Sequence, residues 1–366
     1  MLGLLVIAST SCVDTTTPLD PNQRPPGENL LEAATPPARC SVEQLAPTAM
    51  DLQLHVIDVG QGDALLLRTP DDGDPSNATA MGLTILIDAG NLGELGTNDG
   101  ARYVADWFER EGIERIDYAI VTHAHADHFG GMFGIFERFD VENVVDPGYD
   151  PGTTRYREYL AAAEAEVAEN GGQLFRPPVP GLVTQLGDEL MWGDELTVRL
   201  LAASDRATLG ERDNARVNNT SIVIHIEYNG TRLLLMGDAE EELEAALVNQ
   251  GVDLRANILK VGHHGSSTSS SNLLLSAVWP DEIPRERRLA LISSGRRDFN
   301  GAQLPSVGTV FRLRRATSDD PNVASAARVF STEFGDEVKS EEEAAGDDNI
   351  VTVVRPDGTF DACFVR

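Results

Sequence analysis

Three histidines and an aspartate gather within six residues of the sequence: His123, His125, Asp127 and His128. Imidazole nitrogens and carboxylate oxygens together suit zinc, manganese or iron. So dense a group on one turn can divide between two ions, with His123 and His125 facing one metal and Asp127 and His128 facing the other. The segment therefore predicts a centre for divalent metal ions.

Two further segments carry candidate ligands. Asp238 follows a glycine at the end of an apolar run, and a carboxylate there can bridge two cations about 3.5–4 Å apart. A Gly-Asp pair is also common in plain turns, so the pair alone leaves both interpretations open. Residues 260–267 (KVGHHGSS) place His263 and His264 before a glycine turn. Adjacent histidines there predict a metal-ligand or acid role without ordering the pair.

Each motif follows a stretch that is typical of a buried strand. The apolar runs 116–121, 232–236 and 257–261 lead directly into the three motifs. Residues 101–112 have helical apolar spacing and end at a glycine, which predicts a short helix. Residues 204–217 are expected to form a polar loop. Strands and helices that alternate, with the chemistry at the strands' carboxyl ends, predict an α/β fold.

Composition sets limits on the partners of the chain. Its 366 residues are 41% hydrophobic and 24% charged, which predicts one large globular domain with tails. The net charge is −30, and no long basic run interrupts it. Proteins that bind nucleic acid tightly neutralise phosphates with basic surfaces, so no stable nucleic-acid complex is expected.

The N-terminal segment indicates export. Residues 1–12 form an apolar run that ends in small residues and Cys12, which is similar to a bacterial lipoprotein signal and too short to span a bilayer. Residues 13–49 are rich in proline and polar residues and predict a disordered tether. Residues 50–366 are then the catalytic domain. We expect lipid anchoring through Cys12 at a bacterial membrane, or a periplasmic or extracellular location, with membrane contact only through that anchor.

The two other cysteines are expected to pair. Cys40 and Cys363 lie just outside the predicted catalytic core, one before its first strand and one in a terminal hairpin. Chain ends of compact domains are often close together, and pairing is the usual fate of two thiols in an oxidising compartment. The sequence therefore predicts a disulfide between them.

Six segments follow one another in the order seen in the metallo-hydrolase domain of ComEC-type DNA-uptake proteins. Secreted phosphorylcholine esterases of the same superfamily show a similar order. The segments are residues 55–64 (HVIDVGQGDA), 86–90 (LIDAG), 123–128 (HAHADH), 218–222 (NNTSI), 236–238 (MGD) and 261–266 (VGHHGS). The resemblance spans residues 52–355 and implies a metallo-β-lactamase fold, an αββα sandwich with a dinuclear metal site at one edge.

The resemblance also implies roles for individual residues. The metal ligands would be His123, His125, Asp127, His128, Asp238 and His264, with Asp238 bridging. His263 would be a nearby acid or oxyanion stabiliser, and Asp88 the carboxylate that orients the ligand loop. Asn219, Ser221 and Ser266 lie in the matched segments and are expected beside the ligands or the substrate. Asp58 and Asp63 are expected to organise the first turn rather than bind metal.

The sequence departs from β-lactamases of this fold at one ligand. Those enzymes supply a further histidine before the bridging aspartate, where this chain has residues 217–221 (VNNTS), as ComEC-type domains do. One metal would then lack a nitrogen ligand, which weakens that site or favours manganese. We therefore expect two divalent ions, zinc first and manganese as the alternative. His225 shares a strand face with Ser221 and is either a substitute ligand or a core histidine.

A second departure concerns the substrate. ComEC-type domains tend to have an Asn-x-x-Gly-His-Pro segment, whereas residues 299–305 (FNGAQLP) lack the histidine. Arg296 and Arg297 lie nearby and would either hold a phosphate or be exposed without a role.

These observations predict hydrolysis by a metal-bridged hydroxide, with Asp127, Asp238 and His263 as the catalytic residues. The expected substrate contains a phosphoester or phosphodiester bond and lies outside the cytoplasm. A β-lactamase or lactonase is the first alternative, disfavoured by the missing histidine. A non-catalytic binding protein with a vestigial site is the second, disfavoured because the other ligands are all present.

Overall fold

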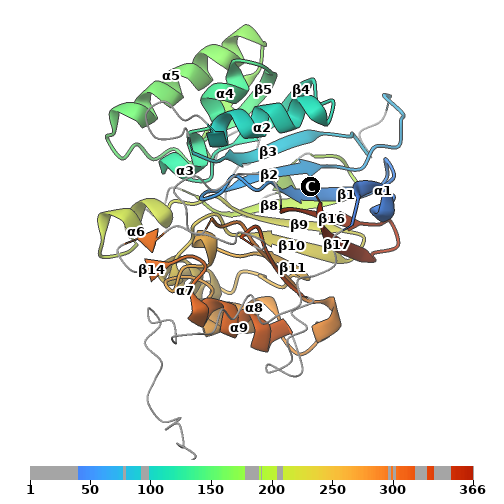
Figure 1. The fold of residues 1–366 in the computed structure, drawn as a ribbon, viewed down its shortest axis with the longest axis vertical. Coiled ribbons are helices and arrows are strands. Elements are labelled where there is room, and N and C mark those ends of the chain that lie inside the picture. The colour runs from blue at the N-terminus through green and yellow to red at the C-terminus, as the bar shows by residue number, and fades with distance from the viewer. Residues whose placement is uncertain are drawn as a thin grey trace, which may run out of the picture.

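Two mixed β-sheets lie face to face in the computed structural model, with helices on their outer faces (Figure 1). The structure describes residues 40–76, 80–91, 99–177, 189–190, 192–203, 209–295, 298–299, 302–317, 328–333 and 348–365. Arg296, Arg297 and the segment 1–39 that contains Cys12 lie outside these ranges.

The first sheet has the strand order β17-β16-β1-β2-β3-β4-β5-β6. Its half from β3 to β6 is parallel, and its other pairs are antiparallel. The strands are β1 (Leu52–Val56), β2 (Ala64–Arg68), β3 (Thr84–Ala89), β4 (Arg115–Ile120), β5 (Asp140–Val145), β6 (Gln173–Phe175), β16 (Asn349–Val354) and β17 (Phe360–Val365).

The second sheet has the order β15-β12-β11-β10-β9-β8-β7. Strands β10, β11, β12 and β15 are parallel to one another, and β7, β8 and β9 continue the sheet with antiparallel pairs. The strands are β7 (Glu189–Leu190), β8 (Leu196–Ala202), β9 (Val223–Tyr228), β10 (Thr231–Leu235), β11 (Ile258–Lys260), β12 (Leu289–Ile292) and β15 (Val329–Ser331). A separate hairpin pairs β13 (Asp298–Phe299) with β14 (Ala302–Gln303).

Helices cover both outer faces, so the layers run helix, sheet, sheet, helix (Figure 1). Helices α2, α4 and α5 pack on the first sheet, while α9 packs on the second beside α8. The helices are α1 (Val42–Leu45), α2 (Asp99–Arg110), α3 (Ala126–Phe129), α4 (Met132–Phe136), α5 (Thr154–Glu169), α6 (Asp213–Asn218), α7 (Glu241–Asn249), α8 (Asn272–Val278) and α9 (Val307–Thr317), with 3₁₀ turns η2 (His263–Gly265) and η3 (Arg285–Arg287). The αββα sandwich expected from the sequence is confirmed.

Alternating side chains on the first sheet build two cores. On β2, Leu65 and Leu67 join the core between the sheets, while Ala64 and Leu66 join the core under the helices. Successive side chains of a strand point to opposite faces, so a strand buried on both faces is apolar throughout. This is why short apolar runs in the sequence predicted these strands.

Two local features differ from the sequence prediction. The segment 204–217, predicted as a polar loop, contains the start of helix α6. Its polar residues Asp213 and Arg216 form an ion pair on one side of the helix, while Ala215 and Val217 are buried on the other side. At the other end of the chain, α1 begins at the capping residue Ser41, within the expected tether. The domain boundaries themselves remain predictions.

The predicted disulfide is confirmed: Cys40 is bonded to Cys363, with their Cα atoms 5.9 Å apart.

Among the residues that the structure describes, no helix has the length and apolarity needed to cross a bilayer.

The buried His55 on β1 is expected to make the stability of the protein depend on pH. Both ring nitrogens of His55 are buried without a hydrogen-bond partner in the described part of the chain, and its ring packs edge-on against Trp107. Burial, aided by the charge of Arg68, lowers the pKa of His55 from 6.5 to about 3. The imidazole thus stays neutral in the folded protein while the unfolded chain takes up a proton below pH 6.5. This contribution to stability is intact above pH 6.5 and is lost as the pH falls toward 3.

We expect His55→Phe to remove that dependence. Relative to the variant, wild type should lose about 1.4 kcal/mol of unfolding free energy per pH unit below 6.5. Urea unfolding of both proteins between pH 7.5 and 5 measures the difference. Parallel pH profiles would show that His55 is not the responsible group.

Candidate metal centre

The first ligand motif, residues 123–128, lies in the loop after β4, at the edge of the first sheet. Tight backbone contacts hold this loop against its neighbours: Asp63 N–H donates to Asp127 O at 3.2 Å, and Gly131 N–H donates to Gly90 O at 3.0 Å. A Cβ atom on Gly62 would lie 2.4 Å from Asp127 O, and one on Gly131 would lie 1.9 Å from Ala89 O. The close approach of these backbones therefore requires glycine at both positions.

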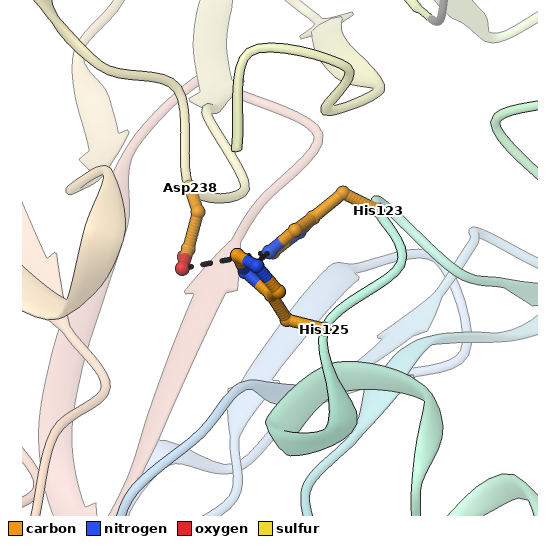
Figure 2. Close-up of side chains that lie close together, drawn as sticks. All are labelled: His123, His125 and Asp238. Carbon is orange, nitrogen blue, oxygen red and sulfur yellow. Dashed lines mark hydrogen bonds and ion pairs between the residues drawn. The ribbon is translucent and has the colours of Figure 1, made fainter. Parts of the chain in front are cut away.

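Asp238 and His264 come to the same place from the second sheet. Asp238 follows β10, and His264 lies in η2 after β11, so the parallel strands β10 and β11 end at the same edge. Asp238 Oδ2 lies 3.6 Å from His123 Nε2, 3.3 Å from His128 Nε2 and 3.4 Å from His264 Nε2. Figure 2 shows His123, His125 and Asp238 pointing toward one another. One carboxylate oxygen thus faces three imidazoles from two loops.

Among the described residues, four overlapping groups of side chains could each hold an ion, and two of these groups contain only predicted ligands. His123, His125 and Asp238 form one, and Asp127, His128 and His264 form the other. In the second group, His264 Nε2 lies 3.5 Å from Asp127 Oδ2. This division is the one that the spacing of the first motif predicted, and Asp238 lies between the groups as a bridging ligand would.

The donor atoms fit divalent metals. His128 Nε2, His264 Nε2 and Asp238 Oδ1 are buried and have no hydrogen-bond partner among the described residues. Buried polar atoms without partners are costly, and a cation would satisfy all three. Imidazole nitrogens with carboxylate oxygens are ligands that zinc accepts.

Asp88 fixes the orientation of His128. Its carboxylate accepts hydrogen bonds from Thr122 N–H (2.8 Å) and Thr122 Oγ1 (2.7 Å) and lies 2.8 Å from His128 Nδ1. With Nδ1 held, Nε2 of His128 is directed at Asp238. The structure places Asp88 where the predicted orienting carboxylate would be. Thr122 completes this arrangement and was missed by the sequence analysis, although it directly precedes His123.

The two adjacent histidines occupy different environments. The His264 side chain is 1% exposed, and its Nδ1 lies 3.0 Å from Ser293 O, which leaves Nε2 for a metal. The His263 side chain is 25% exposed, with Nε2 3.9 Å from Asp238 Oδ2 and Nδ1 3.3 Å from Glu240 Oε1. The geometry agrees with His264 as the ligand and His263 as its polar neighbour.

Of the three other predicted residues, Ser221 and Ser266 lie beside the candidate ligands, and Asn219 does not. Ser221 Oγ accepts a hydrogen bond from Asp238 N–H at 3.0 Å. Ser266 Oγ lies 3.0 Å from Thr268 Oγ1, which in turn lies 3.2 Å from His263 Nδ1. Both serines therefore support the site.

Asn219 does not face the histidines as expected. Its side chain contacts Leu209 O, Glu242 and the Glu240 N–H. Asn218 takes the expected place instead, with Nδ2 3.5 Å from His263 Nε2 and 2.7 Å from Glu240 Oε1. Neighbouring residues at the end of α6 point in different directions, and the sequence does not show which of them faces the site.

His225 is a core histidine rather than a substitute ligand. Its Nε2 lies 3.0 Å from Arg255 O, and it belongs to none of the possible ligand groups among the described residues. The group of His123, His125 and Asp238 therefore has no third imidazole from this strand.

Burial and the neighbouring carboxylates shift the pKa values of the four candidate ligand histidines in opposite directions. Burial lowers the pKa of His123 and of His125. Burial also acts to lower the pKa of His128 and His264, but the nearby carboxylates, above all Asp238, raise both pKa values well above the ordinary one. Because a metal binds the neutral imidazole, a cation at this site would compete with protons at His128 and His264.

Comparison with known proteins gives the following matches. The model of the family described as the metallo-beta-lactamase superfamily matches residues 71–281. ComE operon protein 3 of Bacillus subtilis is 26% identical over 67% of this chain and 28% of its own length. Recombination protein 2 of Haemophilus influenzae is 27% identical over 78% of this chain and 29% of its own length. The chain thus spans less than a third of these relatives. The metallo-beta-lactamase fold protein YhfI from Bacillus subtilis has a solved structure that is 12% identical, with a TM-score of 0.39 over 76% of this chain and 96% of that chain.

Proposed function

The chain belongs to the metallo-beta-lactamase superfamily, and we propose that it is a metal-dependent hydrolase of phosphoester or phosphodiester bonds. The observation that carries the substrate class is the ligand group of His123, His125 and Asp238. β-Lactamases of this fold add a histidine there, whereas Ser221 supports Asp238 here and His225 is bonded elsewhere. Fewer nitrogen donors make a harder site, which suits manganese as well as zinc, and the hard phosphoryl oxygens of a phosphoester are ligands that such ions accept.

Two divalent cations, when bound, would supply an activated water and polarise the phosphoryl oxygen. The ligands would be His123, His125 and Asp238 for one ion and Asp127, His128, His264 and Asp238 for the other. His263 would protonate the leaving group or stabilise the charge that develops on it, because its partly exposed ring borders Asp238. Glu240 and Thr268 hold the other ring nitrogen and so fix the direction of that contact.

One further observation supports a phosphodiester, and a second limits how tightly a long one can bind. Relatives named ComE operon protein 3, Recombination protein 2 and Competence protein ComA match the chain at 26–27% identity, and the last two are named for recombination and competence. The net charge of −30 repels a long polyanion, so binding of such a substrate should be weak and salt dependent. We also propose that the protein is exported, with a lipid anchor on Cys12 and a tether that ends at the disulfide-bonded Cys40.

A panel of two chromogenic substrates tests the proposal. We expect hydrolysis of bis(p-nitrophenyl) phosphate to exceed that of nitrocefin, with Mn²⁺ supporting it as well as Zn²⁺ does. Metal analysis of the same protein serves as the control for loading. Nitrocefin turnover without phosphodiesterase activity would instead establish the β-lactamase alternative. Loaded protein without either activity would favour a binding protein.

A further inference from the structure

A lysine lies fully buried beneath the metal centre. The chain contains two lysines, Lys260 and Lys339, and uses arginine at its other basic positions. Lys260 ends β11, its side chain is 0% exposed, and its Nζ donates to Asp63 Oδ2 at 2.8 Å and to Val261 O at 3.2 Å. An ammonium ion so far from water needs a specific reason, because burying a charge is costly unless it is paired.

The partner of this lysine borders both candidate ligand groups. The Asp63 side chain is 1% exposed, and its Oδ1 lies 3.3 Å from His264 Nδ1. Ligand atoms of Asp63, Asp238 and His264 lie within 4.8 Å of one another, as do those of Asp63, Asp88 and His128. By position alone, Asp63 could therefore take part in a further cation site.

Asp63 and Asp88 perform parallel tasks with different partners. Asp88 lies against His128 Nδ1, and neutral donors of Thr122 hold it in place. Asp63 Oδ1 lies 3.3 Å from His264 Nδ1, which is also 3.0 Å from Ser293 O, and a positive charge holds Asp63. Both carboxylates thus lie behind a candidate ligand histidine, although Ser293 O is the nearer partner of His264 Nδ1. The two carboxylates therefore differ in the group that holds them, which is a charged lysine for Asp63 and a neutral threonine for Asp88.

We propose that Lys260 is a fixed cation that excludes a metal ion from Asp63. It confines divalent ions to the two ligand groups and keeps Asp63 as a positioning residue behind His264. Lysine suits this task because its ammonium is a compact point charge, whereas the planar fork of an arginine needs more space and more acceptors. Metal count and metal position are then set by a residue that touches neither ion. This inference rests on the proposed metal centre.

Removing the ammonium while keeping the chain volume tests the proposal. We expect Lys260→Met to bind one divalent ion more per chain than wild type, because the buried carboxylate of Asp63 has then lost the lysine that balances its charge. Co²⁺ or Mn²⁺ per chain after equilibrium dialysis measures the count, and the visible Co²⁺ spectrum reports a changed ligand set. The double variant Lys260→Met, Asp63→Asn should return to the wild-type count, because the extra ligand is gone.

A matched control separates this effect from simple destabilisation. Glu244 is also fully buried, and its carboxylate accepts the backbone N–H groups of Ser270 and Ser271 away from the ligand groups. Glu244→Gln should lower thermal stability without changing the metal count. If Lys260→Met folds only with metal present, both it and wild type are folded and dialysed with the same metal, and their metal counts are compared as before.

The outcomes distinguish this inference from the proposed function. Wild type and Lys260→Met with equal metal counts and identical Co²⁺ spectra would overturn the role of Lys260 alone. A double variant that keeps the extra ion would show that Asp63 is not its ligand and would overturn the inference too. Wild-type protein that binds no divalent metal would overturn both this inference and the proposed metal-dependent hydrolysis.

Discussion

Asp238→Ala should remove both metal ions and nearly all hydrolysis, whereas His123→Ala should empty one ligand group only. The reason is geometric: Asp238 Oδ2 lies within 3.3–3.6 Å of His123, His128 and His264, so it serves both groups. Stabilisation of transition-state charge by metal is worth several kcal/mol, and about 4 kcal/mol corresponds to about a thousandfold in rate. Metal content by mass spectrometry, together with phosphodiesterase assays, measures both effects.

A buried histidine outside the site provides the control for this comparison. His225 is bonded to Arg255 O and belongs to neither ligand group, so His225→Ala should keep the wild-type metal content even if the protein becomes less stable. An Asp238→Ala protein with wild-type metal content would refute the bridging role. Equal losses in Asp238→Ala and His123→Ala would show that the two ions bind only together.

The sequence was most informative where a motif follows a strand directly. The apolar runs before His123, Asp238 and His263 fixed both the strand and the position of the ligand loop at its carboxyl end. Local spacing could therefore predict which side chains gather at this edge of the sheets, because chain connectivity limits where the end of a strand can lead.

Contacts between distant segments could not be obtained in this way. Lys260 and Asp63 are 197 residues apart, and nothing in either segment shows that their side chains meet. The interpretation of Asp63 as a turn residue missed its place behind His264 for the same reason. Asn218 and Asn219 differ by one step along a helix end, which changes the direction of a side chain without changing the sequence pattern.

Loss of the disulfide should have the largest effect on stability away from the metals. Cys40 and Cys363 close a loop with a sequence separation of 323 residues, and such a bond restricts the unfolded chain far more than the folded one. The bond also attaches Cys40 to the edge strand β17, where Cys40 N–H donates to Phe364 O, and Leu45 packs nearby with Val351 and Val353 of β16. We expect Cys40→Ala to lower the free energy of unfolding by about 2–5 kcal/mol.

Urea unfolding with and without reductant measures this effect and contains its own control. Reduction should destabilise wild type as much as the substitution does, and it should leave Cys40→Ala unchanged, because the Cys40–Cys363 bond is already absent from that variant. The metal content of the folded variant should equal that of wild type, since β17 lies at the sheet edge, separated from the ligand-bearing β4 by β16, β1, β2 and β3. Two free thiols in the denatured, unreduced mature protein, or a wild type that reductant does not destabilise, would contradict the role assigned to this bond.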